Sequence, residues 1–183
     1  MDHQDPAETL HHEHTYILKV VNGLSALADR LRAGGAVEPG TLREAVEFMR
    51  SFADRCHHGK EEDLLFPAME AKGVPESGCP LGALREEHVK GRAAVAALAE
   101  ATEAYAAEGG HEPVLQAIDR IFALYPNHIW KEDQMVFPMV ARLFGAEERA
   151  RLARRFEDVE EAMPAGLHER AAAFADRLER ETG

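Results

Sequence analysis

Apolar residues recur every three or four positions along most of the chain, the pattern that is typical of helices with one buried face. Glycine and proline residues divide this pattern into segments, and none of the segments has the alternating pattern of a strand. The predicted helices span residues 6–33, 41–72, 81–107, 112–144, 146–162 and 165–181. The sequence therefore predicts an all-α protein.

Four of these helices are long and are joined by short loops, which is typical of an antiparallel four-helix bundle. We expect an up-down-up-down bundle over residues 1–145 and a C-terminal helical extension over residues 146–183. The apolar residues of the extension include Phe156, Leu167, Phe174 and Leu178. They either cover the bundle or form a surface for a protein partner.

Polar residues interrupt the apolar stripe of every long helix. The first and third helices each carry a histidine there, and the second and fourth carry a histidine followed four positions later by a glutamate. The six residues are His14, His57, Glu61, His88, His128 and Glu132. Because residues four apart share one face of a helix, each His–Glu pair can present an imidazole and a carboxylate at one point. Four imidazoles and two carboxylates are therefore expected inside the bundle.

The chain also contains an internal repeat. Residues 57–67 align without gaps to residues 128–138, and this alignment matches the two histidines and the two glutamates of the His–Glu pairs. A weaker match joins residues 10–14 to residues 84–88 and aligns the two lone histidines. The bundle is thus predicted to consist of two helical hairpins of similar design.

Six polar groups in an apolar core need partners. An unpaired buried polar group costs about 1–3 kcal/mol, against a net stability of about 5–15 kcal/mol for a domain. A pair of metal ions would satisfy all six, because imidazole with carboxylate suits iron, manganese or zinc and a carboxylate can bridge two ions. If both glutamates bridge, each ion has two histidines and two carboxylate oxygens. Open positions then remain for an oxo or hydroxo bridge and for an exogenous ligand.

This set of residues resembles the hemerythrin-like, HHE cation-binding family over about residues 10–144. The motifs that carry the resemblance are Glu13-His14, Cys56-His57-His58-Gly-Lys-Glu61-Glu62 with Leu65-Phe66-Pro67, Glu87-His88, and Asn127-His128-Ile129 with Lys131-Glu132 and Phe137-Pro138. The resemblance implies a four-helix bundle around a non-haem di-iron centre. It thus implies a cofactor of two iron ions, joined by an oxo or hydroxo bridge and held by the six residues named above.

The fifth histidine of the oxygen-carrying hemerythrins has no counterpart at its usual place. Those carriers have two histidines one turn apart on the third helix, whereas His88 has no histidine one turn away on either side. The fifth nitrogen is missing here or comes from His11, His12 or His58. An α-helical projection places His58 on the flank of its helix, so His57 is preferred as the ligand and His58 is a candidate to support the ligands.

The second carboxylate has two candidate residues. The oxygen carriers have an aspartate five residues after the histidine of the fourth helix, and Asp133 has this spacing. The internal repeat favours Glu132, because Glu132 aligns with Glu61. Both departures from the carriers weaken the expectation of reversible oxygen transport.

Other residues have no predicted role in metal binding. His3 and His168 are expected at the surface or near a terminus, and Cys56 is expected to pack in the core. Pro67 and Pro138 have no N–H for the helical hydrogen bond, so each is expected to kink its helix one to two turns beyond the glutamate.

Composition and charge narrow the range of partners. The 183 residues include 21 Lys and Arg against 33 Asp and Glu, a net charge of −12, without a basic cluster. Such a chain repels nucleic acid and anionic membranes, so neither is expected as a partner. No apolar run approaches the roughly 20 residues that cross a bilayer, and the acidic start of the chain is unlike a leader. With only 2 cysteines and no disulfide framework, a cytoplasmic protein is expected.

Two classes of function follow from such a centre. In the first, the di-iron site binds oxygen, nitric oxide or a related small ligand, for sensing, storage or stress scavenging. In the second, the protein is an enzyme that acts on peroxide or nitric oxide, or an iron donor in the repair of damaged iron centres. The first class is favoured, because the sequence contains no acid–base pair or organic-cofactor motif apart from the metal site.

Overall fold

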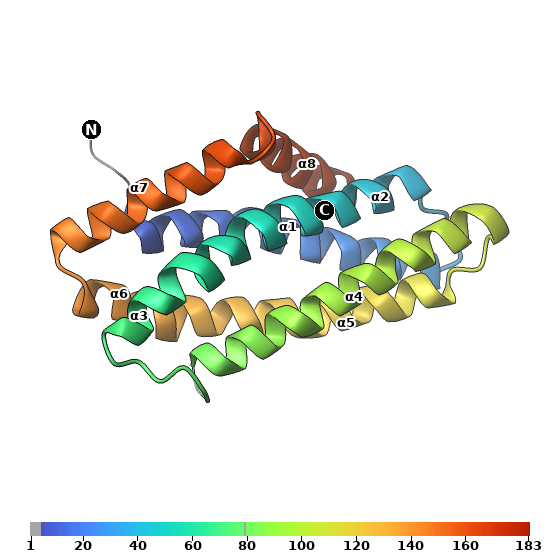
Figure 1. Ribbon diagram of the computed structural model, residues 1–183. Coiled ribbons are helices and arrows are strands. Elements are labelled where there is room, and N and C mark those ends of the chain that lie inside the picture. Colours follow the sequence, from blue (N-terminus) through green and yellow to red (C-terminus); the bar gives the residue numbers. More distant parts are fainter. Residues whose placement is uncertain (1–4, 79) are drawn as a thin grey trace.

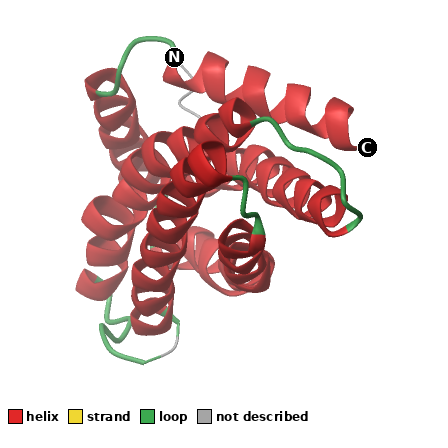
Figure 2. Cartoon of the chain, turned by 90° about the vertical axis from the view of Figure 1, so that its right-hand side faces the viewer, coloured by secondary structure: helices red, strands yellow, loops and turns green. Residues whose placement is uncertain are grey.

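The computed structural model describes residues 5–78 and 80–183 and is a bundle of helices (Figures 1 and 2). Every regular element within these residues is helical, which confirms the predicted all-α fold. His3 and Cys79 lie outside the described residues, so the place expected for His3 stays a prediction.

Four long helices run antiparallel to form the bundle (Figure 1). The first is α1 (Pro6–Arg32), and the third is α4 (Leu81–Glu108). The second consists of α2 (Pro39–Phe48), η1 (Met49–His58), η2 (Glu61–Leu65) and α3 (Phe66–Ala71). The fourth consists of α5 (Glu112–Lys131), η3 (Glu132–Val136) and α6 (Phe137–Leu143), where η marks π-helical segments. The shorter helices α7 (Ala146–Ala162) and α8 (Leu167–Thr182) follow.

Local sequence sets the ends of the helices. At the start of α1 the side chain of Asp5 accepts a hydrogen bond from the Ala7 N–H at 3.0 Å, and Pro6 occupies the first helical position. Helix α4 ends at Glu108 and is capped by Gly109, whose φ of 82° is left-handed and favours glycine. Such signals explain why the predicted helix ends lie within two residues of the observed ones.

The apolar core is divided into two clusters along the bundle. On α1, Leu10 belongs to one cluster and Ile17 to the other, and His14 lies between them. On α4, His88 has the corresponding place. The six polar residues singled out in the sequence form a layer between the two apolar clusters, and we call it the polar layer.

π-Helical turns occur in the second and fourth helices at the level of the polar layer. The Phe66 N–H donates to the Glu61 carbonyl, a bond from residue i to residue i−5, and η3 has the equivalent bond. These turns end two residues before Pro67 and Pro138, the residues at which the sequence predicts kinks. A proline has no N–H, so the α-helical hydrogen bond to the carbonyl four residues before it is absent with or without a π-helical turn.

The C-terminal helices cover one side of the bundle (Figure 1). Helix α7 packs on α1 and η2, and helix α8 packs on α1 and η1. The four apolar residues noted in the extension are all buried: Phe156, Leu167, Phe174 and Leu178. These four side chains belong to the two apolar core clusters of the bundle. Within the described part of the chain, no helix has the length and apolar character needed to cross a membrane.

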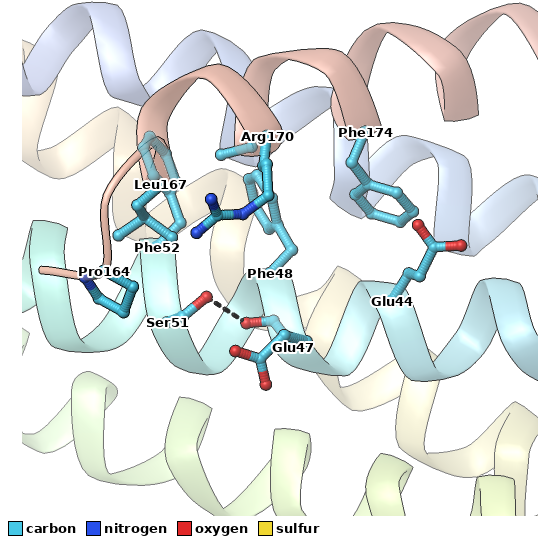
Figure 3. Close-up of a pocket in the computed structure, with 10 residues that line it drawn as sticks. Glu44, Glu47, Phe48, Ser51, Phe52, Pro164, Leu167, Arg170 and Phe174 are labelled. Atoms are coloured by element: carbon cyan, nitrogen blue, oxygen red, sulfur yellow. Dashed lines mark hydrogen bonds between the residues drawn. The ribbon is translucent and has the colours of Figure 1, made fainter.

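A cleft remains between the second bundle helix, at α2 and η1, and α8 (Figure 3). Phe48 and Phe52 of the second helix face Leu167 and Phe174 of the C-terminal segment across it. None of the residues that line this cleft belongs to the polar layer, so the cleft is separate from the site described next.

Candidate metal centre

The structure brings the six predicted residues together in the polar layer. They come from all four bundle helices, and each is at most 3% exposed. Glu132 lies between two histidines, with Oε2 at 3.2 Å from His14 Nε2 and Oε1 at 3.1 Å from His128 Nε2.

The second glutamate has a matching place. Glu61 Oε1 lies 3.9 Å from His57 Nε2, and its Oε2 lies 3.4 Å from His88 Nε2. Each carboxylate thus reaches two different histidines through its two oxygens. A ligand that bridges two metal ions requires this arrangement.

A seventh residue, His58, joins the polar layer. It is 2% exposed, and its ring stacks on that of His88 with centroids 3.8 Å apart. The predicted place of His58 on the flank of its helix is therefore wrong. Because η1 is π-helical up to His58, its wider turns bring both His57 and His58 to the interior.

The five histidines fall into two groups. The three-histidine position consists of His58, His88 and His128, each of which has a ring nitrogen within 4.8 Å of the others. The two-histidine position consists of His14 and His57. A ring nitrogen of each lies within 4.8 Å of the other and of one oxygen of Glu61 and of Glu132. The layer could hold one cation at each position.

All five histidines place Nδ1 against a carboxylate. The pairs, with the Nδ1 to oxygen distances, are His14 with Asp133 (2.9 Å), His57 with Glu13 (2.9 Å), His58 with Asp54 (3.3 Å), His88 with Glu62 (2.6 Å) and His128 with Glu87 (3.1 Å). A carboxylate at Nδ1 favours the imidazole with its proton on Nδ1, which leaves Nε2 free to bind a metal.

The remaining alternatives from the sequence lie outside the layer. His11 is exposed and contacts Asp133 at 2.9 Å, and His12 is exposed as well. Asp133 contacts the outer nitrogen of His14, whereas the Glu132 carboxylate lies among the Nε2 atoms. The geometry therefore favours His58 as the source of a fifth nitrogen and Glu132 as the second carboxylate.

Burial and neighbouring charges shift the pKa values of the layer in opposite directions. Burial and the charge of Glu132 raise the pKa of Glu61 well above its usual range. Burial lowers the pKa of His57 and of His58 well below their usual value. Burial also opposes the charge of His128, but the carboxylates around it outweigh burial and raise its pKa to about 9. A metal that enters the layer would displace protons.

Several buried polar atoms of the layer have no hydrogen-bond partner. They are both carboxylate oxygens of Glu61 and of Glu132 and the Nε2 atoms of His88 and His128, whose close approaches to one another do not have hydrogen-bond geometry. In addition, His14 Nε2 faces His57 Nε2 at 3.0 Å, so two lone pairs meet when both rings are neutral and carry their proton on Nδ1. Two cations would relieve all of these conflicts, and imidazole with carboxylate suits iron, manganese or zinc. The residues therefore fit a two-ion centre.

Sequence reasoning also missed the role of the carboxylates that contact the histidine Nδ1 atoms, which we call the supporting carboxylates. The internal repeat contains a signal for four of the five, because Glu13 aligns with Glu87 and Glu62 aligns with Asp133. Each of these acidic residues directly precedes or follows a residue of the layer. Conserved spacing within the chain itself could have identified them as partners of the ligands.

Comparison with known proteins identifies the family. The Hemerythrin HHE cation binding domain matches residues 5–140. The uncharacterized proteins Mb2018 of Mycobacterium bovis and Rv1995 of Mycobacterium tuberculosis are each 27% identical over 155 residues, covering 84% of the chain and 60% of each relative. The chain thus spans about three-fifths of the length of these curated relatives. No solved structure matches the chain at a significant level. Since the family match covers most of its length, the chain belongs to the hemerythrin HHE cation-binding family.

Proposed function

We propose that the protein holds two non-haem iron ions in the polar layer and uses them to bind oxygen, nitric oxide or a related small ligand. Sensing, storage and stress scavenging are the roles that suit such binding. The observation that carries the proposal is a buried donor set of five imidazoles and two carboxylates with unpaired atoms. The proposed ligands are His14, His57, His58, Glu61, His88, His128 and Glu132.

The protein itself supplies orientation, charge and the exclusion of water. The Nδ1 contacts orient each imidazole, and burial keeps bulk water away from the layer. When bound, iron supplies an open coordination position for a small diatomic molecule. The two positions differ by one imidazole, so they offer unequal numbers of protein ligands. The nitrogen-rich donor set also favours ligand binding over the strongly oxidising chemistry of carboxylate-rich sites.

Metal content is the first test. Protein purified under iron-replete conditions should contain two iron ions per chain. Because a bridging carboxylate serves both ions, Glu61→Ala and Glu132→Ala should lose both together, whereas His14→Ala and His88→Ala should loosen mainly one. A wild-type protein with one ion or none would contradict the proposal. Equal losses in all four variants would contradict the bridging role.

The second test separates binding from catalysis. The iron protein is reduced without oxygen, exposed to oxygen or nitric oxide, and followed by absorption spectroscopy. A ligand that binds and is released unchanged over repeated cycles supports the proposed function. Consumption of oxygen, nitric oxide or peroxide over many cycles would instead identify an enzyme.

A further inference from the structure

A second buried polar cluster connects helix α7 to the polar layer. At its centre is Lys60, whose side chain is fully buried. The Lys60 ammonium forms ion pairs with Glu13 of α1 and with Glu160 of α7, the latter at 2.7 Å from Nζ to Oε1. The ring centroid of Phe156, also on α7, lies 5.7 Å from Nζ. We call Glu160, Lys60 and Glu13 the α7 ion-pair chain.

The α7 ion-pair chain ends on a histidine of the polar layer. Glu13 pairs with Lys60 through Oε1, and its Oε2 accepts a hydrogen bond from His57 Nδ1 at 2.9 Å. The Glu13 side chain is 3% exposed, so both oxygens have protein partners rather than bulk water. An unbroken series of polar contacts therefore leads from α7 to the two-histidine position.

The charges along this series are complementary. The Lys60 ammonium lies between the carboxylates of Glu13 and Glu160, and two opposite charges this close favour its charged form. Lys60 thus stays charged between two carboxylates. Cys56 and His168 border the same cluster, with Sγ and Nε2 3.5 Å apart. Because the Lys60 ammonium already neutralises Glu13, the cluster does not need a further metal ion.

The internal repeat offers a comparison within the same chain. In the second copy Lys131 pairs with Glu87, which accepts a hydrogen bond from His128 Nδ1. These contacts match those of Lys60, Glu13 and His57 in the first copy, but the two lysines differ in their exposure to solvent. The Lys131 side chain is 25% exposed, whereas Lys60 is sealed between the bundle and α7. The C-terminal helices therefore enclose one copy of the motif and leave the other in contact with solvent.

We infer that helix α7 positions the His57 imidazole through Lys60 and Glu13, and thereby stabilises the ion at the two-histidine position. The inference rests on the proposed function, because it concerns how tightly the protein holds one of the two proposed ions. Glu160 is a positioning residue that acts through Lys60. Without the charge of Glu160, Lys60 keeps only its ion pair with Glu13, and the hold of Glu13 on His57 Nδ1 loosens.

The test compares two substitutions on α7. Glu160→Gln removes the negative charge at the α7 end of the ion-pair chain, and Glu148→Gln is the matched control. Glu148 pairs with Lys72 at 2.6 Å, is similarly exposed (33% against 29% for Glu160) and contacts no residue of the polar layer. Glu148 also accepts a hydrogen bond from the Gly145 N–H, a role that glutamine can take over.

Both variants are loaded with iron and exposed to excess chelator, and the iron that remains is followed with time. In Glu160→Gln one of the two ions should leave up to about ten times faster than in the wild type, the lower end of the range for partners of metal ligands. The other ion should leave at its wild-type rate, and Glu148→Gln should match the wild type throughout. Matching release curves for the two variants, or equal acceleration of both ions, would overturn the inference.

The two lysines provide a second pair of variants. Lys60→Met should accelerate loss of the ion at the two-histidine position. Lys131→Met should accelerate loss of the other ion, because Lys131 pairs with Glu87, which contacts His128 Nδ1. The two ions are distinguished by their iron spectra, since one has three imidazoles and the other has two. If both substitutions released the same ion first, the inference would be overturned.

A measurement on the metal-free protein tests this inference independently of the proposed function. Amide hydrogen exchange in residues 49–58 reports on the order of η1 around His57 without any iron. Exchange there should be faster in Glu160→Gln than in Glu148→Gln. A wild-type protein with fewer than two ions would contradict the proposed function and leave this comparison intact. Equal exchange in the two variants would contradict the inference itself.

Discussion

The two ring nitrogens of each histidine in the polar layer have different roles. Nε2 faces the interior of the layer, and Nδ1 contacts a carboxylate. In four of the five histidines that carboxylate comes from a different bundle helix, for example Glu13 of α1 for His57 of η1. The orientation of the proposed ligands therefore depends on how the helices pack, and loss of such a carboxylate should weaken metal affinity about 10- to 100-fold.

Replacement of His58 tests the three-histidine position. His58→Ala should weaken iron binding by at least about ten-fold, because losing a ligand costs no less than losing the partner of a ligand. His11→Ala is the control, since the His11 side chain is 64% exposed and contacts Asp133 instead of the layer. Competition with a chelator of known affinity measures both variants. Equal affinities would show that His58 is not a ligand.

Two supporting carboxylates should make the metal-free protein sensitive to acid. The hydrogen bond from His128 lowers the pKa of Glu87 to about 2. Burial opposes the charge of Glu62, but hydrogen bonds from His88 and Arg92 outweigh it and lower its pKa to about 2. A carboxyl whose pKa is lowered by folding stabilises the fold above its unfolded value of 4.5, and this contribution is lost as the pH falls toward 2.

The pH dependence of the urea midpoint checks this expectation. The midpoint of the metal-free protein should fall as the pH is lowered from about 5 toward 2, and Glu62→Gln should reduce the fall. Glu103→Gln is the control, because Glu103 pairs with Arg43 at an exposed site where water screens the charges. A Glu62→Gln variant that follows the wild type at every pH would refute the assignment.

At the scale of elements, α-helical periodicity accounts for most of what the sequence predicts. Glycine, proline and the spacing of apolar residues mark the helix ends, and the same spacing finds six residues of the polar layer. His58 escapes this reasoning, because the pattern does not encode the π-helical turns that bring it inward. The repeat offers no help here, since His58 and its partner Asp54 align with Ile129 and Tyr125.

The packing of α8 on α1 depends on a glycine. A Cβ at Gly23 would lie 2.5 Å from Leu178 Cγ, which is fully buried and has little room to move. Gly23→Ala should therefore destabilise the protein by about 1–3 kcal/mol. Gly59→Ala is the control, because the nearest atom would be 4.0 Å away, and a helical alanine should add up to about 1 kcal/mol. Thermal unfolding measures both, and a Gly23→Ala protein as stable as the wild type would contradict the close packing.

At the scale of the whole molecule, the polar layer separates two apolar clusters that do not need metal to pack. The metal-free protein should therefore stay largely helical by circular dichroism. It should melt at least about 10 °C below the iron form, because several unpaired buried groups cost about 1–3 kcal/mol each and 1 kcal/mol corresponds to about 2–4 °C at this size. An unchanged melting temperature after chelation would show that metal and fold are not coupled.

The burial of the polar layer also limits how iron can leave. No residue of the layer is more than 3% exposed, so a competing molecule of ordinary size meets the ions only after part of the bundle opens. Once a competitor is in excess, the rate of iron loss should cease to depend on its concentration or its chemical identity. At a given pH, the residence time of iron is then fixed by the internal motions of the helices rather than by the supply of competitor.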